Sequence, residues 1–196
     1  MCGRYHIDIS VEEIQQIVEE IQRQQRQRPE YEQLVIKLDG DIFPTDVVPV
    51  RTGVQDFAPM RWGFTDFKGK PMINARSETA LEKPTFRQSL LERRCLIPAS
   101  SYYEWQTVGK SKVKYRFSLP DQTLYLAGCY RQERDEPVNR FVILTQAAWP
   151  EFAEIHNRMP VLVTPEQAER WFTGDGCDLS SSPAEFYQQL RCKLSC

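Results

Sequence analysis

The chain has few metal-ligating side chains and no pattern that would gather them. It contains two histidines, His6 and His156, and its six cysteines include no Cys-x-x-Cys pair. Structural zinc sites need four ligands at short, regular spacings, so the sequence argues against a metal site, and no other cofactor is expected. Cys95 and Cys129 lie in apolar stretches and are interpreted as small core residues.

The sequence also lacks long apolar runs and a strong net charge. No run approaches the roughly 20 apolar residues of a membrane span, and residues 1–30 contain no signal-like segment. We therefore expect an intracellular, cytoplasmic protein without disulfides or membrane contact. The formal net charge is only -2, so any nucleic-acid site must be a local basic patch.

Few helices are predicted. Apolar residues recur at helical spacing over Ser10–Ile21, and Ser10 with Glu13 has the pattern of a capping box. A Ser or Thr followed three residues later by Glu or Gln also predicts helix starts near Thr85, Thr164 and Ser182. The third of these four helices is expected to end near Gly174.

Strands are predicted over most of the remaining chain. In chain order they are YEQLVIKL, DIFPTDVVPV, VQDFAPMRWGF, RCLIPA, SYYEWQ, VKYRFSL, TLYLAGCYR, RFVILTQAA and MPVLV. Prolines 44, 49 and 59 place the second and third strands at sheet edges or bulges. Strands and helices do not alternate regularly, which argues against a doubly wound parallel sheet. We expect one α+β domain over residues 1–196, with an antiparallel, barrel-like curled β-sheet flanked by short helices.

Four short segments carry polar residues where the surrounding pattern is apolar. They are Cys2-Gly3-Arg4, residues 73–79 (INARSET), residues 102–105 (YYEW) and residues 155–160 (IHNRMP). Each has an ordinary explanation. Cys2 could be a buried thiol, a side-chain nucleophile, or, once Met1 is removed, an N-terminus that offers both an amine and a thiol. Glu104 could be solvated or half-buried, and His156 could be structural. Asn74 could end a strand, and the arginines could be surface charges.

Taken together and in order, these segments resemble the SRAP family of SOS response-associated peptidases, or abasic-site processing proteins. The resemblance runs through MCGR, FPTDVVPV, RWGF, NARSET, RCLIPASSYYEW, LAGCY, VILT and IHNRMPV, and covers nearly the whole chain. The sequence departs from the family in RWGFTDFKGK and in Ser101-Tyr102 before Tyr103. These differences affect the expected shape of the DNA-facing loop, not the chemical centre.

The resemblance implies binding of single-stranded DNA that contains abasic sites. The ring-opened sugar exposes an aldehyde, and an N-terminal cysteine can form a Schiff base with it through the α-amine. The thiol then closes a thiazolidine ring, which gives a covalent DNA–protein crosslink that shields the lesion. The same resemblance implies self-processing that removes Met1, weak lyase activity at the abasic site, and association with the nucleoid.

Residue roles carry over by matching motifs. Cys2 would be the nucleophile and Glu104 the general acid and base, with a pKa raised by flanking aromatics. His156 would assist ring opening, and Asn74 would orient the reacting groups. Phosphates would be held by Arg4, Arg76 and Arg158, and bases would stack on Trp62 and Trp105. The protein is expected to be a monomer, and replication-fork proteins stay open as partners because no sequence feature identifies one.

Three other functions compete with this interpretation. N-terminal-nucleophile glutamine amidotransferases also begin with MCG, but the chain has no Asn-Gly and no Thr-His segment for their oxyanion hole and substrate site. A non-catalytic DNA-binding adaptor would not need Cys2, Asn74, Glu104 and His156 together. A protease acting on other proteins has no supporting feature.

Overall fold

Five strands close into a barrel at the centre of the computed structural model, which describes residues 2–120, 122–173 and 189–195. Around the ring they are β12 (Arg140–Ala147), β4 (Phe57–Trp62), β3 (Val47–Arg51), β8 (Arg94–Ala99) and β11 (Leu124–Arg131). Four neighbouring pairs are antiparallel and the β12–β4 pair is parallel. An odd number of strands cannot close with strict alternation of direction, so one parallel pair is required. The predicted barrel-like α+β fold is confirmed.

Further strands attach to this barrel or lie beside it. A second sheet has the order β15-β10-β9-β1-β2. Its strands are β1 (Tyr5–Ile7), β2 (Gly40–Ile42), β9 (Ser101–Val108), β10 (Ser111–Ser118) and β15 (Arg191–Leu194). The strands β7 (Asn74–Arg76) and β13 (Arg158–Pro160) pair with β12, and β14 (Leu162–Val163) pairs with β11. A small separate pair is formed by β5 (Phe64–Thr65) and β6 (Pro71–Met72).

The prolines do not place β3 and β4 at a sheet edge, because both strands are inside the barrel ring. Pro49 of β3 lies opposite Pro59 of β4. Each strand also pairs with a second strand, but only beyond its proline. Strand β3 pairs with β8 at Arg51, and β4 pairs with β12 from Arg61 onward. Each proline, which has no N–H to donate, therefore lies in a part of its strand that pairs with a neighbour on one side only. The first predicted strand, YEQLVIKL, does not form: it begins at the last residue of the 3-10 helix η1 (Pro29–Tyr31) and contains only a single bridge, at Ile36.

Helix α1 (Glu12–Gln27) buries the predicted apolar face of Ile14, Ile17, Val18 and Ile21. Its predicted capping box is wrong. The N-cap residue is Val11, and the Ser10 hydroxyl donates to the Asp8 carboxylate at 2.6 Å. Glu13 instead accepts a hydrogen bond from the Tyr125 hydroxyl on β11. A tertiary partner has therefore taken the carboxylate that the local pattern assigned to the cap.

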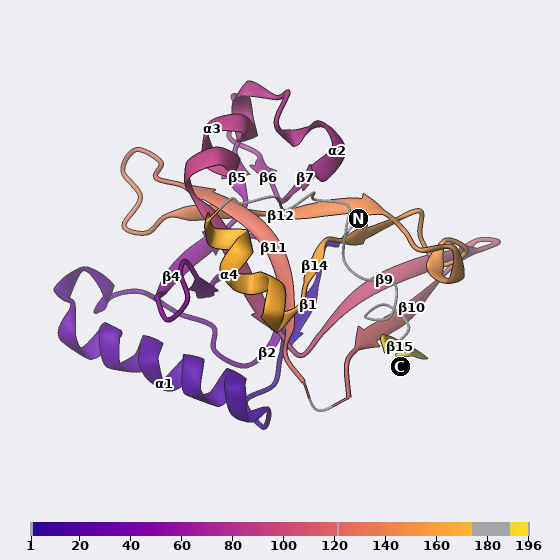
Figure 1. Cartoon of the computed structure of the whole chain (residues 1–196), viewed down its shortest axis with the longest axis horizontal. Coiled ribbons are helices and arrows are strands. Elements are labelled where there is room, and N and C mark those ends of the chain that lie inside the picture. The colour runs from indigo at the N-terminus through magenta and orange to yellow at the C-terminus, as the bar shows by residue number, and fades with distance from the viewer. Residues whose placement is uncertain (1, 121, 174–188, 196) are drawn as a thin grey trace.

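The shorter helices are α2 (Ser77–Ala80), α3 (Pro84–Glu92) and α4 (Pro165–Thr173). For α4 the predicted cap is confirmed: the Thr164 hydroxyl accepts from the Gln167 N–H, and the Gln167 side chain accepts from the Thr164 N–H. Helix α3 has no side-chain cap, so the box predicted at Thr85 is wrong. The helix predicted after Ser182 lies outside the described residues. In Figure 1, α4 crosses in front of β11, and α2 and α3 lie together beyond β12.

The main core cluster combines buried side chains of the five barrel strands with those of the second sheet. It includes residues of β1 such as Tyr5, of β4 such as Trp62, and of β9 such as Tyr102. Cys95 and Cys129 are buried, as predicted. Within residues 2–120, 122–173 and 189–195, no helix is long and apolar enough to cross a membrane. The two sheets meet where the N-terminal segment enters β1, and this is where the predicted site residues gather.

Candidate active site

Cys2 lies at the junction of the two sheets and is completely buried. Its carbonyl oxygen accepts a hydrogen bond of 2.9 Å from Asn74 Nδ2 on β7. Its thiol points to the carbonyl of Arg4, with 3.9 Å between the two atoms, and that carbonyl also accepts from the N–H of Tyr103 on β9. The first residues of the chain are thus held on one side by the barrel and on the other by the second sheet.

Glu104 faces this junction from β9, and its side chain is only 4% exposed. Strand alternation alone left its orientation open, and the structure places it on the buried face. Burial raises its pKa from 4.5 to about 7. Burial also raises the pKa of Cys2, and the negative charge of Glu104 raises it further. The carboxyl group and the thiol therefore act on each other electrostatically across a shared, desolvated space.

His156 completes the group from the loop before β13. Its Nδ1 lies 4.0 Å from Glu104 Oε2 and accepts a hydrogen bond of 3.0 Å from the N–H of Arg158. Burial lowers the pKa of the imidazole, so it is neutral at pH 7. The carbonyl oxygen of Arg158 lies 3.1 Å from the same Nδ1, so this nitrogen accepts from the Arg158 N–H in one tautomer and donates to the Arg158 carbonyl in the other. A neutral imidazole beside a carboxyl group with a pKa near 7 can exchange protons in either direction.

Asn74 and Arg76 share one face of β7, because Ala75 between them is buried on the opposite face. The parallel pairing of β7 with β12 fixes this arrangement, with Asn74 opposite Ile143 and Arg76 opposite Thr145. Arg76 is exposed, and its guanidinium makes no hydrogen bond or ion pair with other described residues. Its position beside Asn74 suits the predicted contact with a phosphate.

Arg4 contacts two aromatic rings at the rim of the site. Its guanidinium carbon is 4.5 Å from the centre of the Phe43 ring and 5.3 Å from that of Trp105. Asp41 lies 3.8 Å from the same guanidinium. Arg4 and Trp105 therefore form one surface, as a stacking and phosphate-binding role requires. The sequence did not indicate Asp41 and Phe43, because nothing local shows that β2 and the turn after it pack against Arg4.

The stacking role predicted for Trp62 is wrong. Its side chain is completely buried, its Nε1 donates to the Ile73 carbonyl at 3.0 Å, and its ring stacks on Phe141 with a centroid distance of 6.3 Å. Trp62 belongs to β4, and the closing of the barrel places this side of the strand inside the core. It supports β7 from behind and cannot reach a base.

Arg158 also differs from its predicted role. Its guanidinium makes two hydrogen bonds to the Glu78 carboxylate, at 2.6 and 2.8 Å, and one of 2.6 Å to the Thr145 carbonyl. Its side chain is only 13% exposed. The ion pair lowers the pKa of Glu78 to about 2. A phosphate would have to displace this carboxylate, so Arg158 is not an open phosphate clamp in this structure. It joins the NARSET and IHNRMP segments.

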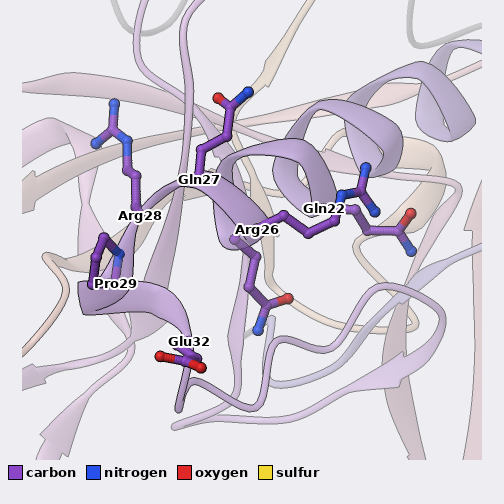
Figure 2. A pocket seen from close by; sticks show the side chains of 7 residues that line it. Gln22, Arg26, Gln27, Arg28, Pro29 and Glu32 are labelled. Carbon is purple, nitrogen blue, oxygen red and sulfur yellow. The ribbon is translucent and has the colours of Figure 1, made fainter.

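Another hollow lies at the end of α1, and it is separate from this group of residues. It is lined by Gln22, Gln25, Arg26, Gln27, Arg28, Pro29 and Glu32. Figure 2 shows that the side chains of Arg26 and Arg28 point away from each other and do not converge on one point. These side chains are exposed or half-buried and come from a single stretch of chain. Substitutions in this hollow can therefore serve as controls for substitutions at the site on β7 and β9.

Replacing Arg76 with alanine is expected to weaken binding of single-stranded DNA and to reduce its salt dependence. Loss of one phosphate contact removes about 0.7 from the slope of log affinity against log salt. The difference from the wild type should therefore be largest at low salt. Fluorescence anisotropy over a salt series measures both quantities. Arg26→Ala, at the far end of α1, is the matched control; equal losses in the two variants would remove Arg76 from the binding surface.

The part of the chain that the structure describes contains no group of three His, Cys, Asp or Glu side chains suited to a metal ion. Cys2, Asn74, Glu104 and His156 converge, with Arg4, Trp105 and Arg76 at the rim. Met1 lies outside the described residues.

Comparisons with known proteins relate the chain to several abasic site processing proteins. It is 38% identical over 130 residues to YoqW of Bacillus subtilis, and this match covers 61% of the chain and 58% of YoqW. It is 31% identical over 118 residues to YedK of Escherichia coli, covering 58% and 53% of the two chains. It is 29% identical over 146 residues to HMCES of Gallus gallus, covering 57% and 44%. The chain thus spans about half the length of these relatives.

Solved structures share the fold. A crystal structure of a protein from Bordetella bronchiseptica superposes with a TM-score of 0.74 at 23% identity, over 99% of both chains. Another, from Bacteroides thetaiotaomicron, gives 0.71 at 21% identity, over 97% of this chain and 91% of that one. The model of the SOS response associated peptidase family matches residues 1–193. Because this match covers nearly the whole sequence, the chain belongs to the SOS response associated peptidase (SRAP) family.

Proposed function

We propose that the chain processes abasic sites in single-stranded DNA by forming a covalent bond between Cys2 and the ring-opened sugar. The observation that carries this proposal is the convergence of four groups from distant segments. Asn74 holds the Cys2 carbonyl, the buried Glu104 interacts electrostatically with the Cys2 thiol, and His156 lies 4.0 Å from Glu104. The relatives' names, abasic site processing proteins, suggest the same substrate.

The chemistry begins with removal of Met1, which leaves Cys2 with a free α-amine and a thiol. The amine attacks the aldehyde carbon, and the resulting carbinolamine loses water to give an imine. The thiol then adds to the imine carbon, its proton moves to nitrogen, and a five-membered thiazolidine closes. One molecule of water is released overall. An α-amine with an ordinary pKa near 8 is partly neutral at cellular pH and is a better nucleophile there than a lysine.

Glu104 moves the protons in these steps. With a pKa of about 7, it can donate a proton to the departing hydroxyl and accept one from the attacking amine or thiol. Its place beside Cys2 also suits it to activate water for hydrolysis of the Met1–Cys2 peptide bond. The proposal therefore includes self-processing, and the same group serves both reactions.

Asn74 orients the reacting groups, and His156 assists opening of the sugar ring. The Asn74 amide nitrogen fixes the Cys2 carbonyl, while its buried Oδ1 has no hydrogen-bond partner among the described residues. That oxygen can accept from the amine or from a sugar hydroxyl. His156, neutral at pH 7, can take the hydroxyl proton as the sugar ring opens. An imine at the sugar also makes the 3′ phosphate eliminable, so slow strand cleavage is the expected side reaction when the ring does not close.

The test uses a labelled single-stranded oligonucleotide with one abasic site. A heat-stable adduct should appear on a denaturing gel, with an intact mass equal to the chain without Met1 plus the oligonucleotide minus water. An oligonucleotide whose aldehyde has first been reduced with borohydride should give no adduct. Binding without an adduct would support an adaptor instead. Release of ammonia from glutamine would support the amidotransferase alternative.

A further inference from the structure

A second hollow, of about 420 Å³, lies between the start of α2 and the segment that follows β12. Ser77 and Glu78 line one side, and Gln146, Trp149 and Pro150, with two alanines between them, line the other. Of the residues that line it, Glu78 forms an ion pair with Arg158. Its wall is more apolar than polar, which is the usual character of a site for a small organic group.

The hollow lies next to the candidate active site, in the direction in which β7 runs into α2. Asn74 contacts Cys2, Arg76 lies two residues farther along the same face of β7, and Ser77 and Glu78 follow directly. Three residues of extended chain span about 10 Å. On the opposite side, Gln146 and Ala147 of β12 pair with Met159 and Arg158, close to His156. If a DNA strand places its abasic sugar at Cys2 and a phosphate at Arg76, the next group along that DNA strand reaches this hollow.

The side chains of the hollow favour a base over a phosphate. Glu78, with a pKa of about 2, keeps its negative charge and occupies the two terminal nitrogens of Arg158 that a phosphate would need. Trp149 packs its inner part against the core, so the exposed part of the indole is a firm surface. Aromatic rings of this kind stack on bases without sequence preference. Ser77 and Gln146 supply polar atoms at the edge.

We propose that this hollow receives the base of the nucleotide next to the abasic site, stacked on Trp149. The inference rests on the proposed function, since the abasic sugar at Cys2 sets the register of the strand. The walls that hold the base are Trp149 and Pro150 on one side and Ser77 with Glu78 on the other. A baseless neighbour would leave the hollow empty and lose this contact.

The test combines changes in both partners. Oligonucleotides carry one abasic site with a normal nucleotide or a baseless tetrahydrofuran spacer at the adjacent 5′ or 3′ position. At one of these positions the spacer should weaken wild-type binding by about tenfold, the effect of one stacked base. Trp149→Ala should weaken binding of the normal oligonucleotide by a similar factor and leave the spacer oligonucleotide unchanged. Trp149→Phe, which keeps an aromatic ring, should restore most of the affinity.

Two further variants keep the outcome clear if Trp149→Ala folds poorly. Ala147→Leu adds a side chain at the hollow without removing packing and should show the same base-dependent loss. Val35→Ala trims an apolar side chain that is 89% exposed elsewhere and should change nothing. The inference is overturned if both variants of the hollow weaken the normal and spacer oligonucleotides equally. In that case adducts would still form with every oligonucleotide, whereas failure of the proposed function would give no adduct with any.

Discussion

Cys2→Ala is expected to abolish the heat-stable adduct while leaving binding of single-stranded DNA within about twofold of the wild type. The variant still has an α-amine after Met1 removal, so it can form an imine. It has no thiol to close the ring, and an imine is hydrolysed under denaturing conditions. We therefore expect the loss to be complete on a heated gel, and a weaker adduct to appear only when borohydride is added to reduce the imine.

Cys192→Ala is the matched control for this experiment. Cys192 is a free cysteine on β15 that is partly exposed, unlike the buried Cys2. Its replacement should leave the adduct unchanged. A heat-stable adduct of normal yield in Cys2→Ala would show that another nucleophile does the chemistry. Loss of the adduct in both variants would point to a general effect of cysteine replacement rather than to the position of Cys2.

Glu104→Gln is expected to slow adduct formation by about a hundredfold or more, the usual contribution of a positioned proton-transfer group. The amide is nearly the same size as the carboxyl group but cannot donate and accept the protons of amine attack and dehydration. Single-turnover rates between about pH 5 and about pH 9 should show an inflection near pH 7 in the wild type, where Glu104 titrates. The variant should lack this inflection.

The same variant should be more stable than the wild type at alkaline pH. Glu104 loses its proton near pH 4.5 in the unfolded chain and near pH 7 in the folded chain. The folded state therefore holds the extra proton between these values, and the free energy of unfolding of the wild type falls as the pH rises from about 4.5 to about 7. Glutamine has no proton to lose, so the variant avoids a loss of about 3 kcal/mol at pH 8.

Urea unfolding at about pH 5 and about pH 8 measures this difference in stability. The gap between Glu104→Gln and the wild type should be wider at the higher pH. Glu151→Gln, on the exposed turn η2 (Pro150–Phe152), is the control and should change neither stability nor rate. If the variant forms the adduct more slowly but is no more stable at pH 8, Glu104 transfers protons but its burial does not destabilise the folded state. A variant with normal rate would remove Glu104 from proton transfer.

The sequence predicted most strands well because their apolar runs are local signals. RCLIPA, SYYEWQ, VKYRFSL, TLYLAGCYR and RFVILTQAA all became strands, and the α4 cap formed where Thr164 and Gln167 predicted it. The boxes at Ser10 and Thr85 did not form. In the first of these a partner 112 residues away, Tyr125, takes the Glu13 side chain. Local rules hold where no distant residue competes.

The candidate site also combines features that the sequence predicted with contacts between distant segments that it could not predict. The resemblance identified the residue types, and the structure brings Cys2, Asn74 and Glu104 together with His156 from the far end of the chain. It could not show that closing the barrel buries Trp62, because a strand pattern does not say which face becomes the interior. Nor could it pair Arg158 with Glu78 across 80 residues. Such contacts depend on the register of β7 and β13 on β12, which no local pattern fixes.

The depth at which Cys2 lies has a consequence for chemical selectivity. Peroxides and alkylating agents react with thiolates, and they react quickly only with thiols that they can reach. Burial and the neighbouring Glu104 charge raise the pKa of Cys2, so before processing its sulfur is both protonated and hidden. A sulfur that is protonated and buried reacts slowly with oxidants, so the nucleophile of the proposed reaction is protected in the free protein.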